Sequence, residues 1–219
     1  MSSDRHRELI ERLVEDARPV APLWSPAVRL ALWLGLATVI FMLTVHAGLR
    51  RDLGARLGDP LFCLELVTLL TGAVALAALA FRAAVPGREP GRREVGVAAG
   101  LVALAAVLWL RLPMRTEMPI SEFVHVGSGC MARTVLLAAA PWAALLVALR
   151  RGAPLAPVTA ALLAAGAAFV MAFAVMRLVC NLDELLHILV WHAGPILGGM
   201  AVSALIGVAW LSRWRRGDL

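Results

Sequence analysis

Residues 158–179 read VTAALLAAGAAFVMAFAVMRLV, an apolar run whose only charged residue, Arg177, stands near its end. A helix needs about 20 apolar residues to cross the hydrocarbon core of a bilayer. Inside that core a helix satisfies its own backbone hydrogen bonds, which lipid cannot do. The run therefore predicts a transmembrane helix, and its many alanines predict close packing against neighbouring helices.

Six such apolar runs follow one another along the chain, and the third is the shortest. They cover Arg29–His46, Leu61–Phe81, Val95–Leu110, Val124–Leu149, Val158–Val179 and Leu185–Leu211. Charged residues make up only 16% of the chain, against about a quarter in a soluble domain. The predicted fold is an all-α integral membrane protein. We expect a six-transmembrane-helix bundle over residues 29–212, a cytoplasmic tail with a short amphipathic helix over residues 1–28, and a C-terminal cytoplasmic tail over residues 213–219.

The arginines predict the orientation of these spans. All 21 basic residues are arginines; if the N-terminus is cytoplasmic, the segments on that side hold 14 of them and the opposite loops hold six. Cytoplasmic loops carry the excess of basic residues in multi-span proteins. We therefore expect a multi-pass protein of the bacterial inner membrane, in contact with lipid and with both termini in the cytoplasm. The scattered arginines argue against direct binding of nucleic acid, which favours one basic patch.

Two arginines lie deepest within the predicted spans. Charges at such depth usually face the interior of the bundle and find a partner, unless a long side chain reaches the interface. We expect Arg133 to form an internal ion pair and Arg177 to extend to the outer interface. Glu65 and Glu184 are the candidate partners.

The N-terminal tail carries apolar residues at helical spacing, followed by three prolines that end the helix. A lone amphipathic helix on a stiff tether is a typical ligand for a groove on a partner protein. The alternative is a helix that lies on the inner leaflet, but its polar face mixes acidic and basic residues and suits anionic lipid poorly. The candidate partner-binding residues are Leu9, Ile10, Leu13, Val14, Asp16, Pro19 and Val20.

Two stretches at the start of predicted spans share a Glu-x-x-His spacing, Glu122–His125 and Glu184–His187. Positions three apart share one face of a helix, so that the carboxylate and the imidazole can bind one metal ion. The candidate metal ligands at the outer face are therefore Glu122, His125, Glu184 and His187. The alternative is that polar residues gather near membrane interfaces, where they are easily solvated.

All three cysteines, and four of the five histidines, fall at the outer ends of predicted spans. Cys130 and Cys180 are candidates for a redox-sensitive or structural pair, or for soft metal ligands, whereas Cys63 has the character of a small buried hydrophobe. The sequence contains no nucleophile paired with a base and no phosphate-binding glycine loop, and no catalytic residue or firm cofactor is predicted. The competing function is a membrane metal-binding redox protein that uses these Glu-x-x-His and Cys ligands.

Several short motifs together resemble the NrsF-type bacterial anti-sigma factors. The first is Glu8-Leu9-Ile10-x-x-Leu13-x-x-Asp16-x-x-Pro19-Val20-x-x-Leu23-x-x-Pro26-x-x-Arg29, and the others are Gly129-Cys130, Pro141, Leu149-Arg150-Arg151-Gly152-Ala153-Pro154 and Cys180. The resemblance covers nearly the whole chain. Within the family the sequence looks most like the CarR-type subgroup, which regulates light-induced carotenoid synthesis.

The resemblance implies a six-span inner-membrane protein whose tail holds an extracytoplasmic-function sigma factor away from RNA polymerase. A stimulus such as metal, oxidant or singlet oxygen then frees the sigma factor, and the family's paired cysteines, implicated in sensing, map onto Cys130 and Cys180. One segment departs from the family. After the second cysteine its members often have a proline and small polar residues, where this chain has Asn181-Leu182-Asp183-Glu184.

Overall fold

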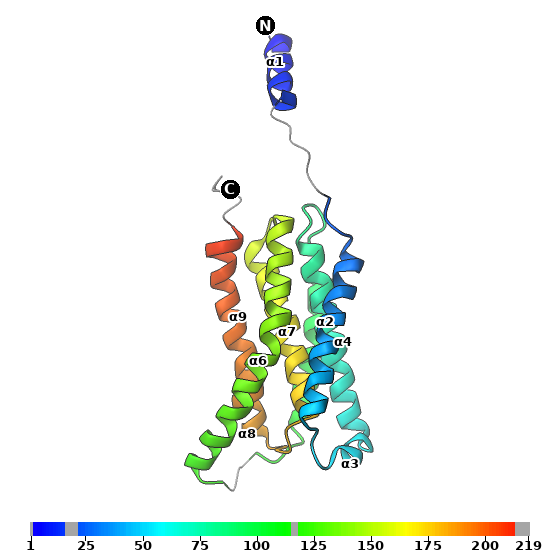
Figure 1. The fold of residues 1–219 in the computed structure, drawn as a ribbon, viewed down its shortest axis with the longest axis vertical. Helices are drawn as coiled ribbons and strands as arrows, with labels where there is room; N and C mark the ends of the chain where they lie inside the picture. Colours follow the sequence, from blue (N-terminus) through cyan, green and yellow to red (C-terminus); the bar gives the residue numbers. More distant parts are fainter. Residues whose placement is uncertain (1, 16–21, 115–117, 213–219) are drawn as a thin grey trace.

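The computed structural model describes residues 2–15, 22–114 and 118–212, and within these ranges it contains helices and no strand (Figure 1). The elements are α1 (Ser2–Glu15), α2 (Pro26–Ala47), α3 (Leu53–Leu57), α4 (Pro60–Ala83), α5 (Arg92–Trp109), α6 (Ile120–Gly152), α7 (Pro157–Arg177), α8 (Leu185–His187), the π-helix η1 (Ile188–Ala193), α9 (Gly194–Ile206) and the π-helix η2 (Gly207–Leu211). Elements α8 to η2 form one continuous helical stretch. The predicted all-helical fold is confirmed.

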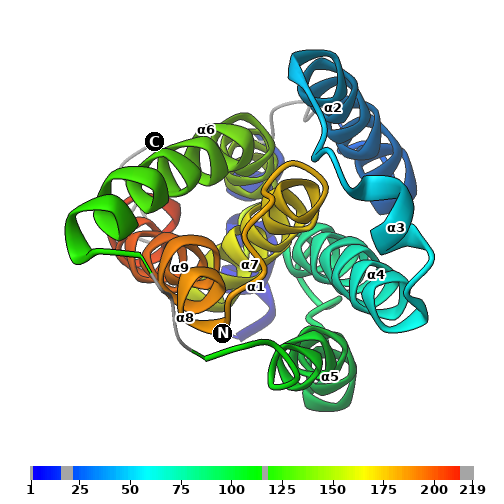
Figure 2. The same ribbon diagram turned by 90° about the horizontal axis from the view of Figure 1, so that it is seen from below.

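Helix α7 is the central helix of the bundle, and it coincides with the run that opened the sequence analysis. Of its 21 residues 17 are buried, because α4, α6 and α9 all pack against it (Figure 2). Its alanines and Gly166 allow these neighbours to approach closely. Large side chains such as Phe169 and Phe173 fill the spaces that remain.

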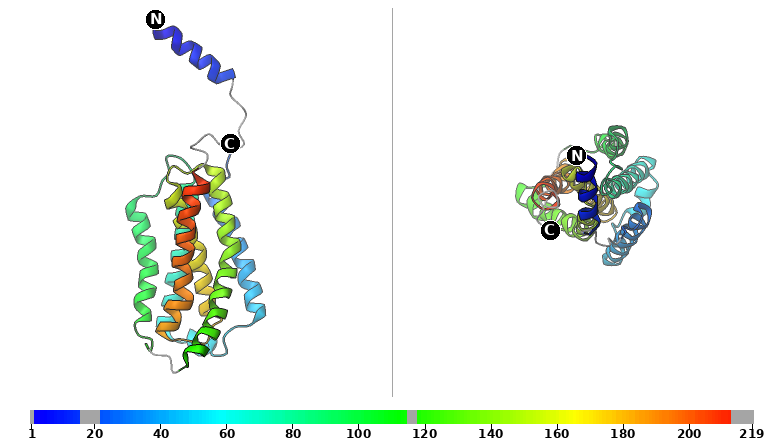
Figure 3. Two further views of the ribbon diagram at one scale, coloured as in Figure 1. Left: turned by 90° about the vertical axis from the view of Figure 1, so that its left-hand side faces the viewer. Right: turned by 90° about the horizontal axis from the view of Figure 1, so that it is seen from above.

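Within the described part of the chain, five helical stretches are long and apolar enough to cross a membrane: α2, α4, α6, α7 and Leu185–Leu211. Helix α5 covers the third predicted run, but it has only 18 residues and begins with Arg92, Arg93 and Glu94. Figure 3 shows that α5 nevertheless lies alongside the bundle, where it packs against α4. The sequence and the fold thus agree on a helical membrane protein, and the sixth crossing stays a prediction.

Small residues set the closest contacts between helices. A Cβ added to Gly152, the last residue of α6, would overlap the carbonyl oxygen of Ala84 and lie 2.7 Å from its Cβ. A Cβ added to Gly199 in α9 would lie 2.6 Å from a ring carbon of Phe169. Because real Cβ atoms do not approach other atoms so closely, these contacts depend on glycine.

Helix α2 lies at the edge of the bundle, attached by two polar side chains. The guanidinium of Arg29 donates to the carbonyl oxygen of Phe81 at 2.9 Å, and the indole of Trp33 donates to the carbonyl oxygen of Pro141 at 3.0 Å. These bonds tie α2 to α4 and α6 in a part of the protein where a buried polar group without a partner is costly.

The two ends of the bundle differ. The cysteine end, as we call it, carries the loops over residues 47–60 and 178–184, together with the start of α6. Helix α1 lies beyond the opposite end, separated from the bundle (Figure 1). The side chains of Leu9, Ile10 and Val14 on α1 are exposed.

Candidate functional site at the cysteine end

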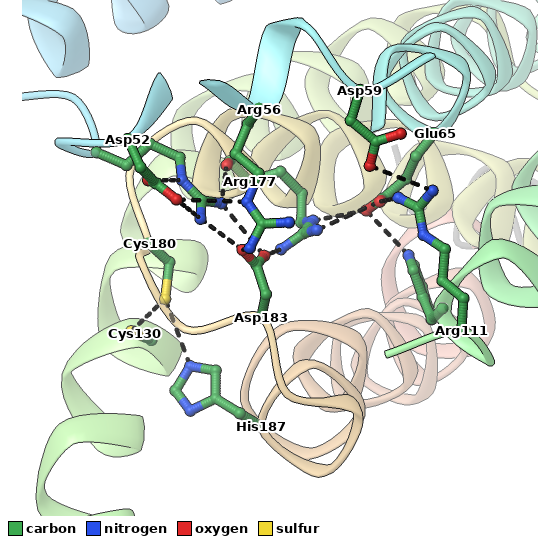
Figure 4. Close-up of polar contacts among 12 residues, drawn as sticks. Asp52, Arg56, Asp59, Glu65, Arg111, Cys130, Arg177, Cys180, Asp183 and His187 are labelled. Atoms are coloured by element: carbon green, nitrogen blue, oxygen red, sulfur yellow. Dashed lines mark hydrogen bonds and ion pairs between the residues drawn. The ribbon is translucent and has the colours of Figure 1, made fainter. Parts of the chain in front are cut away.

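A buried network of charges lies at the cysteine end, centred on Arg177 at the last turn of α7 (Figure 4). Its guanidinium contacts Glu65 of α4 at 2.5 Å and Asp183 of the α7–α8 loop at 2.6 Å. The Arg177 side chain is 2% exposed and that of Glu65 is fully buried. Because both side chains are buried away from water, each charge is stabilised mainly by its ion-pair partner. The network therefore fixes the α7–α8 loop to α4.

The segment between α2 and α4, which contains α3, completes this network. Arg50 contacts Asp183 at 2.5 Å and Asp52 at 2.7 Å, and Arg56 contacts Asp183 at 2.6 Å. The hydrogen bond from Arg50 lowers the pKa of Asp52 to about 2. Burial opposes the ionisation of Asp183, but hydrogen bonds from Arg50 and Arg177 and their positive charges still lower its pKa. Both carboxylates therefore stay ionised at neutral pH.

The network reverses the two expectations for the deep arginines. Arg177 does not extend to the interface but forms the internal ion pair, whereas Arg133 is exposed on α6. The reason is the position of the helices. The end of α7 is surrounded by other elements, while the first half of α6 is at the periphery of the bundle. Of the two partners considered, Glu65 is the one that Arg177 meets.

Next to this network lies a cluster of two cysteines and two histidines, which we call the Cys/His cluster: Cys130, Cys180, His187 and His192. One nitrogen or sulfur atom from each of them lies within 4.8 Å of the others, and all four residues are buried. The sulfurs of Cys130 and Cys180 are 3.7 Å apart, and the Cys180 sulfur is 3.5 Å from Nε2 of His187. The cysteines are free thiols. Hydrogen bonding with Cys130, helped by His187 and His192, lowers the pKa of Cys180.

The local fold explains how three separate segments meet in the Cys/His cluster. Cys130 lies in the first half of α6, and Cys180 lies in the loop that follows α7, held by a backbone hydrogen bond from its N–H to the carbonyl oxygen of Met176 at 2.8 Å. His187 ends α8, and His192 lies in the π-helix η1. The charge network anchors the same loop at Asp183, three residues after Cys180.

The π-helix is what places His192 beside His187. In an α-helix, positions five apart are turned by about 140° from each other. The i→i+5 hydrogen bonds of a π-helix widen the turn and bring such positions toward one face, and the two imidazole centroids are 5.2 Å apart. Pro195 gives a local reason for the irregularity, because it has no N–H to donate to the carbonyl of Trp191.

Aromatic rings enclose the Cys/His cluster. His192 stacks on Phe173 with a centroid distance of 5.6 Å, and Phe123 meets His187 edge-on at 6.3 Å. The ring of Trp191 occupies the space that a side chain at position 127 would need, which is why glycine stands there. The cluster is thus shielded from solvent and lipid.

The structure brings together only some of the residues that the sequence singled out. Cys130, Cys180 and His187 meet in one cluster, whereas Glu122 and His125 are exposed on α6. Glu184 is the N-cap residue of α8 and is not among the four clustered residues, although its Oε2 atom is buried and has no partner in the described ranges.

The remaining predicted residues lie elsewhere. Cys63 is partly buried, and its thiol donates to the carbonyl oxygen of Leu57 at 3.2 Å. Leu9, Ile10 and Val14 are exposed on α1, and Leu13 belongs to the same helix. Asp16, Pro19 and Val20 lie outside the described residues.

His192 is a member of the site that was not predicted from the sequence. Its signal was the pair His187-x-x-x-x-His192 just before Gly194-Pro195. A spacing of five residues does not bring two side chains together in an α-helix, so the pair looked unrelated. A proline shortly after it is the clue that the helix changes its pitch there.

These features define a class: a helical membrane protein that carries a buried cluster of thiols and imidazoles at one end and a separate helix beyond the other. The sequence matches the NrsF family, described as negative regulator of sigma F, over residues 13–214. The chain therefore belongs to this family, whose described function is the negative regulation of a sigma factor. No curated protein and no solved structure gives a match.

Proposed function

We propose that this protein is a membrane-bound anti-sigma factor that sequesters an extracytoplasmic-function sigma factor through its N-terminal tail. The observation that carries the proposal is α1, which presents Leu9, Ile10 and Val14 to the surroundings at 55%, 59% and 67% exposure. Burying one such side chain in a partner contributes roughly 1.5–3 kcal/mol. Three or four of them outweigh the cost of ordering a short tail on binding.

The proposed location is the bacterial inner membrane, crossed six times with both termini in the cytoplasm. Five helices of sufficient length support a multi-pass protein, and the excess of arginines on the side of the N-terminus supports this orientation. In the proposal α5 supplies the sixth crossing beside α4. The tail and the sigma factor then share one compartment.

Deleting residues 1–20 is expected to abolish repression, so that sigma-dependent transcription becomes constitutive while the protein still inserts into the membrane. The single substitution Ile10→Glu is expected to act in the same direction, because it places a charge within the apolar stripe. The measurement is a sigma-dependent reporter, together with capture of the sigma factor by the full-length protein in detergent.

Glu11→Gln is the matched control for this experiment, since Glu11 is exposed on the polar face of α1. It is expected to leave repression and capture unchanged. Full repression after removal of residues 1–20 would show that the tail does not hold the sigma factor.

The proposal includes a sensor at the other face of the membrane, built by Cys130 and Cys180. An envelope, redox or light-dependent stimulus such as singlet oxygen would act there and release the sigma factor, in the CarR-type case to induce carotenoid synthesis. The two sulfurs lie 3.7 Å apart. An oxidant that accepts two electrons would join them in a disulfide while both thiol protons leave.

Replacing Cys130 and Cys180 with serine is expected to reduce the response to the stimulus to background while basal repression persists. The reason is that the sensor and the tail lie at opposite ends of the bundle. The measurement is the induction ratio of the reporter at equal protein levels, with Cys63→Ser as the control that responds normally. Loss of basal repression would instead assign the cysteine pair to sigma binding.

A further inference from the structure

The Cys/His cluster contains two thiols and two imidazoles, the donor set that tetrahedral zinc sites use in proteins. Three segments supply the four side chains, and all four are buried. No carboxylate belongs to the set, because Asp183 and Glu65 face the arginines of the neighbouring network. The cluster is therefore soft in character and separate from the ion pairs beside it.

Two distances within the cluster match the edges of a tetrahedron around a metal ion. Metal–sulfur and metal–nitrogen bonds of about 2.3 Å and 2.0–2.1 Å place two sulfurs about 3.8 Å apart and a sulfur and a nitrogen about 3.5 Å apart. The observed separations are 3.7 Å between the sulfurs and 3.5 Å between Cys180 and Nε2 of His187. These are two of the six edges of the tetrahedron, and all four ligand atoms lie within 4.8 Å of one another.

Charge favours a divalent ion in this place. Two thiolates and one dication sum to zero, and neutral imidazoles add no charge, so that the loaded site is neutral overall. A neutral site is far cheaper to bury than an unpaired charge. A monovalent ion would leave one negative charge among the rings of Phe123, Phe173 and Trp191.

Each histidine of the cluster also has a buried ring nitrogen without a partner in the described ranges. The Nδ1 atoms of both His187 and His192 are buried and have no hydrogen-bond partner within the part of the chain that the structure describes. Buried polar atoms are paired in the great majority of cases. Since Nε2 of His187 faces the Cys180 sulfur, an ion bound there would leave Nδ1 of His187 outside its coordination shell.

We propose that Cys130, Cys180, His187 and His192 form a tetrahedral site for a divalent d¹⁰ cation, occupied by Zn²⁺ in the resting protein. On binding, the two thiols lose their protons and each thiolate donates an electron pair to the ion, with two protons released per ion bound. The ion links the start of α6 to the α7–α8 loop and to η1. This site goes beyond the proposed binding of a sigma factor and does not depend on it; in the loaded site, a two-electron oxidant would join the two thiolates in a disulfide and release the Zn²⁺.

The test is the metal content of the full-length protein, purified in detergent from cells grown with zinc. We expect about one zinc per chain, lost in His192→Asn and Cys180→Ser. The controls are His125→Asn and Cys63→Ser, which change the same residue types outside the cluster and are expected to keep the ion. Absence of zinc from the unchanged protein, or full retention in His192→Asn, would overturn the proposal.

A second measurement uses the unchanged protein and so avoids variants that misfold. After chelation under reducing conditions, added Zn²⁺ is expected to slow the alkylation of Cys130 and Cys180 by a maleimide and to leave Cys63 unaffected. Added Co²⁺ is expected to give the intense visible bands of a tetrahedral thiolate complex. Equal alkylation rates with and without Zn²⁺ would contradict the site.

Capture of the sigma factor, followed in the same preparations, keeps the two proposals apart. If the protein captures the sigma factor but contains no zinc, the metal site is refuted and the anti-sigma function is not affected. Bound zinc without capture leaves the metal site standing and counts against the anti-sigma function.

Discussion

Replacing Arg177 with methionine is expected to lower the free energy of unfolding by about 3–5 kcal/mol, the usual cost of removing one partner from a buried ion pair. Methionine keeps most of the apolar stem but leaves Glu65 without its closest cation and removes one of the three arginines that contact Asp183. Because Glu65 is fully buried, it cannot turn to water. The measurement is the midpoint of detergent-induced unfolding.

Arg133→Met is the matched control, because Arg133 is exposed on α6. It is expected to change the free energy of unfolding by no more than about 0.5 kcal/mol. Adding Glu65→Gln to Arg177→Met is expected to recover part of the lost stability, since it removes the stranded carboxylate. Equal stability of the two arginine variants would refute the importance of the network.

Gly152→Ala is expected to destabilise the bundle by about 1–3 kcal/mol, the typical cost of forcing extra atoms into a packed interior. The added methyl group would overlap the backbone oxygen of Ala84. A backbone atom cannot rotate away as a side chain does, so α4 and α6 must separate. The same unfolding measurement detects the effect, as does the fraction of protein that resists proteolysis in membranes.

Gly129→Ala provides the comparison within the same helix. A Cβ at this position meets nothing within 4 Å, and alanine is the better helix former by up to about 1 kcal/mol. This variant is therefore expected to be as stable as the unchanged protein or slightly more stable. If Gly152→Ala and Gly129→Ala changed the stability by the same amount, the close approach of α4 and α6 would not explain the loss in Gly152→Ala.

The helices could be predicted from the sequence because apolar runs of bilayer length have few other uses. The burial of α7 was also foreseeable, since its alanines signal contact with other helices on every side. The third of the six predicted runs differs from the others in length. Arg92, Arg93 and Glu94 open α5, and they shorten its apolar part below the length of the other spans.

The site could be predicted only in part, because its contacts join distant segments. Arg50 and Asp183 are 133 residues apart, and no feature of either segment by itself indicates that the two side chains are in contact. The sequence shows that Arg177 lies within a predicted span. Whether its side chain forms an ion pair or extends to the interface depends on whether its helix is central in the bundle. His192 was missed because its alignment with His187 requires a π-helix, which follows from hydrogen bonding rather than from spacing.

Cys180 follows α7 almost directly, and Asp183 anchors the same short loop to α4 and to the loop after α2. Helix α7 itself has 21 residues, which makes it a rod roughly 30 Å long. Most of its residues are buried against neighbouring helices, from Pro157 at one end to Arg177 beside the Cys/His cluster at the other. The Cys/His cluster and the end of the bundle that faces α1 are thus joined by one buried helix.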